Sequence, residues 1–171
     1  MLGPRFREPP CEPRSRARDL GPPNQRQGGP VINQGAGGGI RTPPGQGDVR
    51  VLVVDDQPFF RDAARSVLEA LSGFRAAGEA CSGYEAVIVV AELRPELVLI
   101  DIRMPGMNGI EAARHITADH PETVVVLIST DDVADAASTV RACGAVAFVR
   151  KQDFGPSFLR ALWAQHDPRL D

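Results

Sequence analysis

The chain has 171 residues and a formal net charge of -3. It contains no apolar run long enough to cross a bilayer and no apolar segment that would serve as a secretory signal. These features argue against a membrane protein and favour a cytoplasmic one. Cys11, Cys81 and Cys143 are expected to be reduced thiols, because their odd number and their spacing suit neither a disulfide framework nor a metal site.

The composition changes sharply near residue 48. Residues 1–48 contain seven Arg, four acidic residues, ten Gly and nine Pro, with few large apolar side chains. Such a segment cannot bury enough surface to offset the entropy lost on ordering, so residues 1–48 are predicted to be disordered. The remaining 123 residues carry a net charge of -6, since the first 48 contribute +3, and suit one compact domain at 49–171.

Residues 1–48 have two other interpretations, and the sequence argues against the first. Their arginines are scattered among Pro and Gly without aromatic neighbours, which argues against a nucleic-acid-binding arm. A valine codon can start translation in bacteria, so Val49 is a candidate for the true first residue and the preceding segment for an untranslated one.

Short apolar runs alternate with helical patterns along the second part of the chain. The runs predict strands at residues 49–54, 74–80, 97–100, 123–128 and 145–149. Helices are predicted at 58–71, from Ser82 to before Pro95, from Asn108 to before Pro121, at 131–143 and at 156–166. This alternation indicates a parallel sheet with right-handed crossovers, and therefore a doubly wound α/β fold of five strand–helix units.

Local signals support several helix ends. Pro58 and Pro156 suit a first helical turn, and Gly144 suits a C-terminal stop. Ser82 and Asn108 each precede a Glu by three residues, which is the spacing of a capping box. The apolar residues at helical spacing in the first helix are Phe59, Ala63, Val67 and Leu71.

Acidic residues follow two of the apolar runs, and the only lysine of the chain follows another. Asp55 and Asp56 end the first run, Asp101 the third, and Ser129 the fourth, while Lys151 comes just after the fifth. The carboxyl ends of parallel strands meet at one edge of the sheet, so these side chains are expected to gather there. Three close carboxylates need a cation to stay ionised, and Mg²⁺ suits a site of oxygen ligands.

Simpler interpretations account for only part of this pattern. One aspartate after the first strand would suffice as a helix cap, and Pro105-Gly106 explains a turn but not an acid at the end of a buried strand. A carboxylate beside Mg²⁺ can act as a nucleophile toward phosphorus. In a chain that otherwise uses Arg, a single Lys151 indicates that a compact point charge is needed there.

Taken together, these residues resemble the receiver domain of bacterial response regulators. The resemblance covers about residues 50–166. Two sequence motifs, Val-Val-Asp-Asp-Gln-Pro and Leu-Ile-Ser-Thr, are most similar to those of receivers joined to a helix-turn-helix DNA-binding domain. It implies a flavodoxin-like (βα)5 fold with strand order 2-1-3-4-5. No output domain follows the last helix, so a stand-alone receiver of two-component signalling is expected. The motif residues are Asp55, Asp56, Asp101, Met104, Pro105, Gly106, Ser129 and Lys151.

The resemblance also implies a role for each motif residue. Asp101 would accept a phosphoryl group from a sensor histidine kinase or a phosphotransfer protein. Asp56, Asp101 and the backbone carbonyl of Arg103 would hold Mg²⁺, and Asp55 would act mainly through water. Ser129 and Lys151 would contact the phosphoryl oxygens.

The switch and the partners follow from the same resemblance. Phe148 falls where the family has an aromatic residue that turns inward on activation, together with Ser129. The predicted helix at 131–143, the strand at 145–149 and the helix at 156–166 would form the surface that a downstream protein binds. Its candidate contacts are Phe158, Leu162 and Trp163. The chain would catalyse only its own phosphoryl transfer and dephosphorylation and bind no DNA or membrane directly. A phosphorylation-dependent homodimer is compatible with the resemblance. Gln152 after Lys151, and Thr130 after Ser129, depart from the commoner family residues Pro and Ala.

Three other functions are less well supported. A phosphatase of the haloacid-dehalogenase type needs a second Asp where Arg103 stands. A flavin mononucleotide binder needs amides after the first strand, whereas Asp55 and Asp56 would repel its phosphate. The principal alternative is a phosphorylation-independent interaction module with the receiver fold.

Overall fold

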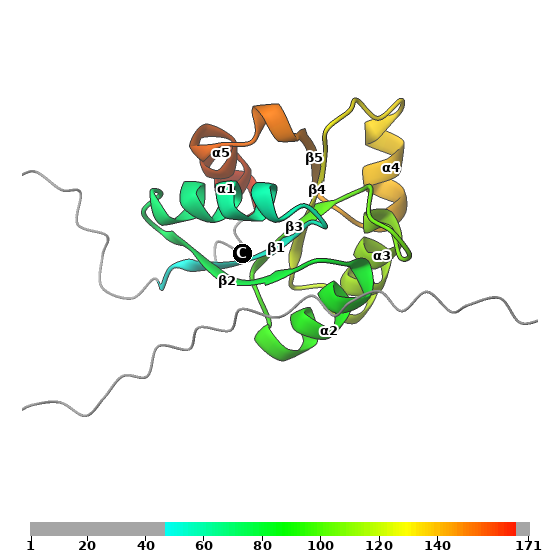
Figure 1. Ribbon diagram of the computed structural model, residues 1–171, viewed down its shortest axis with the longest axis horizontal. Helices are drawn as coiled ribbons and strands as arrows, with labels where there is room; N and C mark the ends of the chain where they lie inside the picture. Colours follow the sequence, from blue (N-terminus) through cyan, green and yellow to red (C-terminus); the bar gives the residue numbers. More distant parts are fainter. Residues whose placement is uncertain (1–46, 167–171) are drawn as a thin grey trace, which may run out of the picture.

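The computed structural model describes residues 47–166, which form a single five-stranded parallel sheet between two layers of helices (Figure 1). The strand order is β2-β1-β3-β4-β5, so the predicted doubly wound fold and its strand order are confirmed. The element bounds are β1 Val49–Val54, α1 Pro58–Glu69, β2 Phe74–Ala80, α2 Gly83–Leu93, β3 Leu97–Asp101, α3 Gly109–Asp119, β4 Val124–Ser129, α4 Ala136–Cys143, β5 Ala147–Arg150 and α5 Pro156–His166. The prediction for residues 1–48 falls almost wholly outside the described part.

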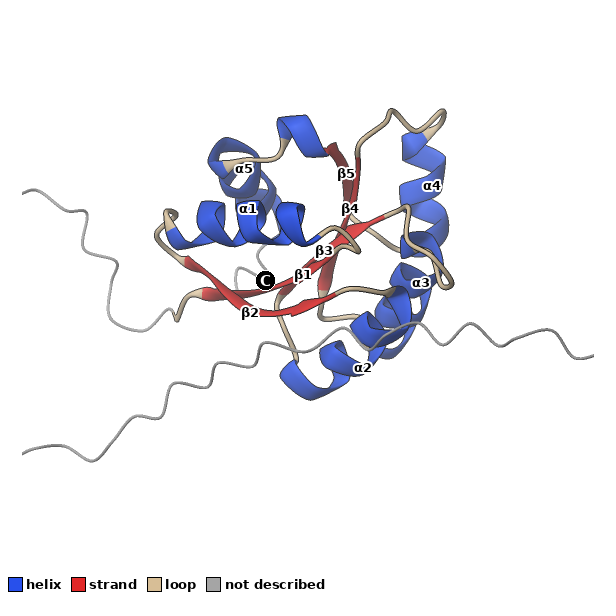
Figure 2. Cartoon of the chain, viewed as in Figure 1, coloured by secondary structure: helices blue, strands red, loops and turns tan. Residues whose placement is uncertain are grey.

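Helices cover both faces of the sheet (Figure 2), and two apolar clusters, one on each face, form the core. On one face α1 and α5 pack through Leu68, Leu159 and Trp163 against alternate residues of β1, β3 and β4. On the other face α2, α3 and α4 pack against the intervening residues. Because the central strands are covered on both faces, they read as continuous apolar runs in the sequence. In the described part of the chain, no helix has the length and apolar character that a bilayer crossing requires.

The caps predicted from the sequence form with one variation. Asn108 and Glu111 make a complete capping box at α3. The Ser82 side chain accepts from the Glu85 N–H at α2, but the Glu85 carboxylate accepts from the Cys81 N–H, one residue before the cap, at 2.7 Å. Both helices therefore begin where the sequence predicts, and both start beside the carboxyl edge of the sheet.

Three structural expectations are corrected. The fourth helix begins at Ala136 rather than at residue 131, because the Asp135 side chain caps it through the Ser138 N–H. Phe59 and Ala63 lie on the solvent side of α1, and Phe59 is 86% exposed; the core side is formed by residues one position later, such as Leu68. Trp163 is buried against Phe74 and cannot serve as a surface contact.

Smaller differences affect the last part of the sheet. β5 begins at Ala147 and ends at Arg150, rather than spanning residues 145–149. A 3-10 turn that the sequence did not indicate, Lys151–Asp153, joins it to α5. Leu162 is buried like Trp163, whereas Phe158 is half-buried.

Replacing Arg94 with glycine is expected to stabilise the domain by about 0.5–1 kcal/mol. Arg94 ends α2 in the left-handed region at φ 47°, where a Cβ atom is unfavourable and glycine is the usual residue. Its ion pair with Glu122 is exposed, so its loss costs little. In urea unfolding, Arg94→Gly should have a higher midpoint than Arg94→Ala. The alanine variant loses the same side-chain contacts but keeps the Cβ atom. Equal midpoints for the two variants would show that this backbone position carries no strain.

Candidate functional site

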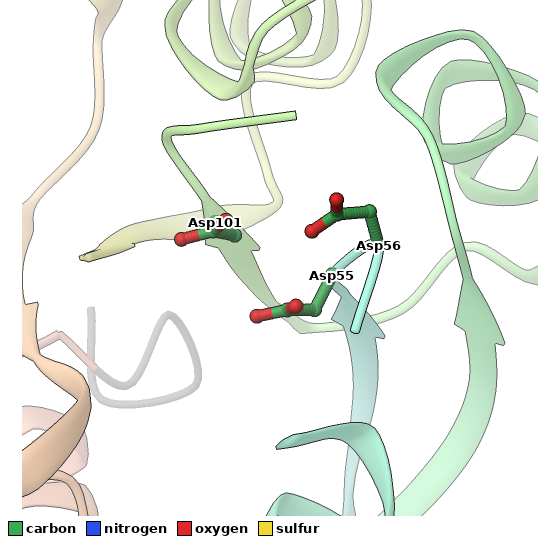
Figure 3. Close-up of side chains that lie close together, drawn as sticks. All are labelled: Asp55, Asp56 and Asp101. Carbon is green, nitrogen blue, oxygen red and sulfur yellow. The ribbon is translucent and has the colours of Figure 1, made fainter. Parts of the chain in front are cut away.

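Three aspartates meet at the carboxyl edge of the sheet, at the point where the strand order reverses. Asp55 and Asp56 follow β1, and Asp101 ends the adjacent strand β3; the two strands are paired in register through Val54 and Ile100. Each aspartate offers one oxygen, and these oxygens lie within 4.8 Å of one another. Figure 3 shows the three carboxylates converging on one small region. The helices that follow β1 and β3 pack on opposite faces of the sheet, and the edge between two such strands is the usual ligand position of doubly wound folds.

Asp55 and Asp56 differ in burial and in hydrogen bonding. Asp55 is fully buried, and one of its oxygens accepts from the Gln57 N–H at 2.8 Å. Asp56 is half-buried, and its buried Oδ1 has no hydrogen-bond partner among the described residues. A buried acceptor without a donor is costly, and a bound cation would satisfy it.

Lys151 supplies the counter-charge within the cluster. Its Nζ lies 2.7 Å from Asp55 Oδ2 and 3.6 Å from Asp101 Oδ1. The side chain is only 12% exposed, and its ion pair with Asp55 lacks hydrogen-bond geometry. The ammonium therefore partly neutralises the cluster, and it lies nearer to Asp55 than to the aspartate that ends β3.

The cluster raises the pKa of Asp101 to about 6. Burial of the carboxyl is the largest cause, and the neighbouring Asp55 charge adds to it. Lys151 acts in the opposite direction but does not cancel these effects. Asp101 is consequently a buried carboxylate with two like charges beside it, which is a strong attractant for a divalent cation.

Two other predicted site residues lie at the same edge. Ser129 ends β4 one position beyond the residue paired with Asp101, is buried, and accepts from the Asp131 N–H at 3.3 Å. The Arg103 guanidinium pairs with Asp131 at 2.9 Å, and both side chains are exposed. That pair joins the loop after β3 to the loop after β4.

The predicted switch residue Phe148 lies on β5, away from the acidic cluster. Its ring is half-buried and packs against the core cluster that faces α2, α3 and α4. Thr130, which directly follows Ser129, is exposed.

Sequence reasoning missed two residues that shape the site. Arg61 donates to the Asp55 carbonyl at 2.7 Å and pairs with Glu79, which holds the loop after β1. The ring centroid of Phe60 lies 4.8 Å from Lys151 Nζ. Both residues follow Pro58 on α1, but no local pattern shows which turn of the helix faces the sheet edge.

An apolar groove of about 420 Å³ runs beside the acidic cluster, between α1 and the segment after β5. The exposed Phe59 ring stands on its rim, and Ala63 and Val67 continue the wall along α1. Lys151 and Thr130 also line this groove. A partner seated there would lie next to the charged groups of the site.

The residues present fit a magnesium ion. Among residues 47–166, the site offers carboxylate oxygens from Asp55, Asp56 and Asp101 and no nitrogen or sulfur ligand, and it includes the unsatisfied oxygen of Asp56. Magnesium binds through one or two carboxylates and retains several waters, so a complete cage of protein ligands is not needed.

Fold and site together define a class of protein: a doubly wound α/β domain with an acidic cluster, beside an ammonium group, at the switch point of its sheet. The family model for the response regulator receiver domain matches residues 51–162. The chain belongs to this family, as its resemblance in sequence predicted.

The relatives carry the receiver domain within longer proteins. Response regulator GacA of Pseudomonas protegens is 34% identical over 103 residues, covering 60% of this chain and 48% of the relative. Protein-glutamate methylesterase/protein-glutamine glutaminase 3 of Hahella chejuensis is 38% identical over 109 residues, covering 63% of this chain and 31% of the relative. The chain thus spans about a third to a half of the length of the curated relatives it matches.

Solved receiver domains have the same fold. The receiver of the putative response regulator NarL from Mycobacterium tuberculosis aligns with a TM-score of 0.65 and 30% identity, over 71% of this chain and 98% of that one. The response regulator domain of Thermotoga maritima CheB aligns with a TM-score of 0.62 and 31% identity, over 70% of this chain and 96% of that one. Both solved chains are domains of response regulators, and both align with this chain over nearly their whole length.

Proposed function

We propose that the chain is a phosphorylation-dependent signalling receiver in which Asp101 accepts a phosphoryl group from the phosphohistidine of a kinase or phosphotransfer protein. The observation that carries this proposal is the convergence of three carboxylate oxygens within 4.8 Å beside an ammonium group. Family membership supports a role in two-component signalling. The chain would work in the cytoplasm, where such kinases present their phosphohistidine, and would catalyse no reaction besides its own phosphorylation and dephosphorylation.

The transfer uses the carboxylate of Asp101 as the nucleophile. One Asp101 oxygen forms a bond to phosphorus while the bond from phosphorus to the donor imidazole nitrogen breaks, and the electron pair stays on the imidazole. Asp56, Asp101 and the Arg103 carbonyl would hold a magnesium ion, with Asp55 acting through its water. When bound, this ion offsets the negative charge of the carboxylates and of the phosphoryl oxygens.

Lys151 and Ser129 would bind the transferred group. The ammonium already lies 3.6 Å from an Asp101 oxygen, so a phosphoryl group on that residue comes within reach of a charge-assisted hydrogen bond. Ser129 is buried at the end of β4 on the same edge, and its hydroxyl can donate to a second phosphoryl oxygen.

The groove beside α1 is our candidate docking site for the phosphodonor. Its lining is mostly apolar and includes Lys151 of the acidic cluster. Phe59, which is 86% exposed, adds to the apolar lining of this groove, and a continuous apolar surface beside the acidic cluster suits a partner contact.

The first test of the proposed function is phosphorylation by acetyl phosphate and Mg²⁺, read by intact mass. The wild-type chain should gain one phosphoryl group, and omission of Mg²⁺ should prevent the gain. Asp101→Asn should gain none, whereas Asp132→Asn, a change at an exposed aspartate outside the cluster, should label like wild type. Full labelling of Asp101→Asn would show that the acceptor is elsewhere. An unlabelled wild-type chain would favour a phosphorylation-independent interaction module.

Phosphorylation would then alter the surface formed by α4, β5 and α5. Cys143 is the only buried residue of α4, so this helix is held by few core contacts and can shift at low cost. Phe158, half-buried on α5, remains a candidate contact for the downstream protein. Leu162 and Trp163 are buried and are no longer candidates. Residues 49–171 carry a net charge of -6, which argues against direct DNA binding.

Lys151→Ala and Ser129→Ala should weaken this coupling more than they weaken folding. Removing either side chain takes away a group that binds the phosphoryl oxygens, a contact worth about 1.5–3 kcal/mol when charge-assisted. Amide spectra should show smaller beryllofluoride-induced shifts around Phe148 in both variants than in wild type. Wild-type shifts in both variants would rule out their role in the switch.

A further inference from the structure

We infer that Phe60 is a positioning residue that holds the Lys151 ammonium at the phosphoryl site, and this inference rests on the function proposed above. The ring centroid lies 4.8 Å from Lys151 Nζ, within the range of a cation–π interaction. The carboxylates of Asp55 and Asp101 lie 2.7 Å and 3.6 Å from the same nitrogen. The ammonium is thus held both by two carboxylates and by the face of an aromatic ring.

The aromatic ring differs from a polar partner in what it leaves available. A lysine ammonium has three N–H donors, and a carbonyl or a carboxylate in place of the ring would take one of them. The ring attracts the positive charge without accepting a conventional hydrogen bond. Lys151 Nζ already lies 2.7 Å from an Asp55 oxygen and 3.6 Å from an Asp101 oxygen, so a ring on its remaining side leaves the donor that does not face these carboxylates available for a phosphoryl oxygen.

The structure around Phe60 fixes the ring. Its N–H donates to the Gln57 carbonyl in the first turn of α1, and its side chain packs against the core cluster of the α1 and α5 face. A second ring, Phe154, lies 5.9 Å away between centroids at a tilt of 55°. Phe154 directly follows the 3-10 turn that begins at Lys151, so the two rings join α1 to the segment that carries the lysine.

A leucine at position 60 would keep an apolar contact but remove the negative ring face. The ammonium would then be held only by the carboxylates, and it would spend less time in the position that meets a phosphoryl group. We expect Phe60→Leu to weaken the binding of beryllofluoride in Mg²⁺ by about threefold to thirtyfold, the range that corresponds to a partly buried cation–π contact. Phe60→Tyr retains the ring and should bind within about twofold of wild type.

The chain allows a direct test because Lys151 is its only lysine. Labelling the full-length chain with ¹³C,¹⁵N-lysine gives the side-chain signals of a single lysine, so their assignment is unambiguous. The ring current of Phe60 should shift the Lys151 ε-methylene protons upfield in wild type and in Phe60→Tyr. In Phe60→Leu these signals should move toward the shift of a free lysine. Phe158→Leu is the matched control, because Phe158 packs against the same core cluster and carries no cation over its ring in the described part.

The two measurements separate the possible outcomes. An unchanged lysine shift in Phe60→Leu, or a lost shift with unchanged beryllofluoride affinity, would each overturn the inference. If Phe60→Leu loses its folded amide spectrum, Phe60→Met replaces it as the non-aromatic variant. If wild type itself neither binds beryllofluoride nor gains a phosphoryl group, the proposed function fails, while the lysine shift still reports whether the ring holds the ammonium.

Discussion

Asp101→Asn is expected to raise the stability of the metal-free domain by about 2–3 kcal/mol at pH 8. In the wild-type chain, burial and the Asp55 charge raise the pKa of Asp101 from 3.8 to about 6. A carboxyl whose pKa is higher in the folded state than in the unfolded state holds its proton more tightly when folded. Its contribution to stability is therefore complete below pH 3.8 and is lost as the pH rises through 6. Asparagine resembles the neutral form and avoids this loss.

The prediction is checked by measuring how the difference in unfolding free energy between Asp101→Asn and wild type varies with pH. Urea unfolding in EDTA should show wild type and Asp101→Asn nearly equal at pH 4, with the variant gaining stability mainly between pH 4 and pH 6. The exposed Asp48→Asn carries the same chemical change and should show no such profile. Adding Mg²⁺ at pH 8 should stabilise wild type more than the variant, because the ion binds the folded cluster. A variant less stable than wild type at pH 8 in EDTA would contradict the repulsion described here.

Gly109→Ala is expected to destabilise the domain by about 3 kcal/mol and to slow phosphorylation of Asp101. A Cβ atom on Gly109 would lie 2.1 Å from the Asp101 carbonyl oxygen and 3.0 Å from the Ile102 Cα. Both are backbone atoms, so no side chain can move aside to make room. The loop between β3 and α3 would have to shift, and with it the backbone of the acceptor.

Gly155→Ala is the matched control for this steric argument. Gly155 has no atom within 4 Å of an added Cβ, and its replacement should change stability by less than about 1 kcal/mol. Urea unfolding and acetyl phosphate labelling of both variants would measure the two effects. If Gly109→Ala matches Gly155→Ala in both, the close approach at the start of α3 is not needed to position Asp101.

Local patterns were enough to predict the order of the elements and the residues at the sheet edge. The strands β1, β3 and β4 are mostly apolar because they are buried on both faces. Asp55 directly follows β1, and Asp101 and Ser129 are the last residues of β3 and β4. Parallel strands share one carboxyl edge, so chain order alone predicted that Asp55, Asp56 and Asp101 would meet.

Where two local choices were nearly equivalent, only tertiary packing decided. On α1 the pairs Phe59-Phe60 and Ala63-Ala64 form two apolar stripes one residue apart, and packing against the sheet buries the second. Before α4, several aspartates can cap a helix. Asp131 pairs with Arg103, and Asp135 caps the helix.

The arrangement of charge within the site also depends on the tertiary structure. The sequence determined which side chains reach the edge, because that follows from strand order and from the position of each residue at a strand end. It did not determine that Lys151 lies nearer to Asp55 than to Asp101, or that Phe60 lies beside the ammonium. These distances depend on how α1 and the turn after β5 pack against the sheet, and residues about 90 positions apart in the chain take part in that packing.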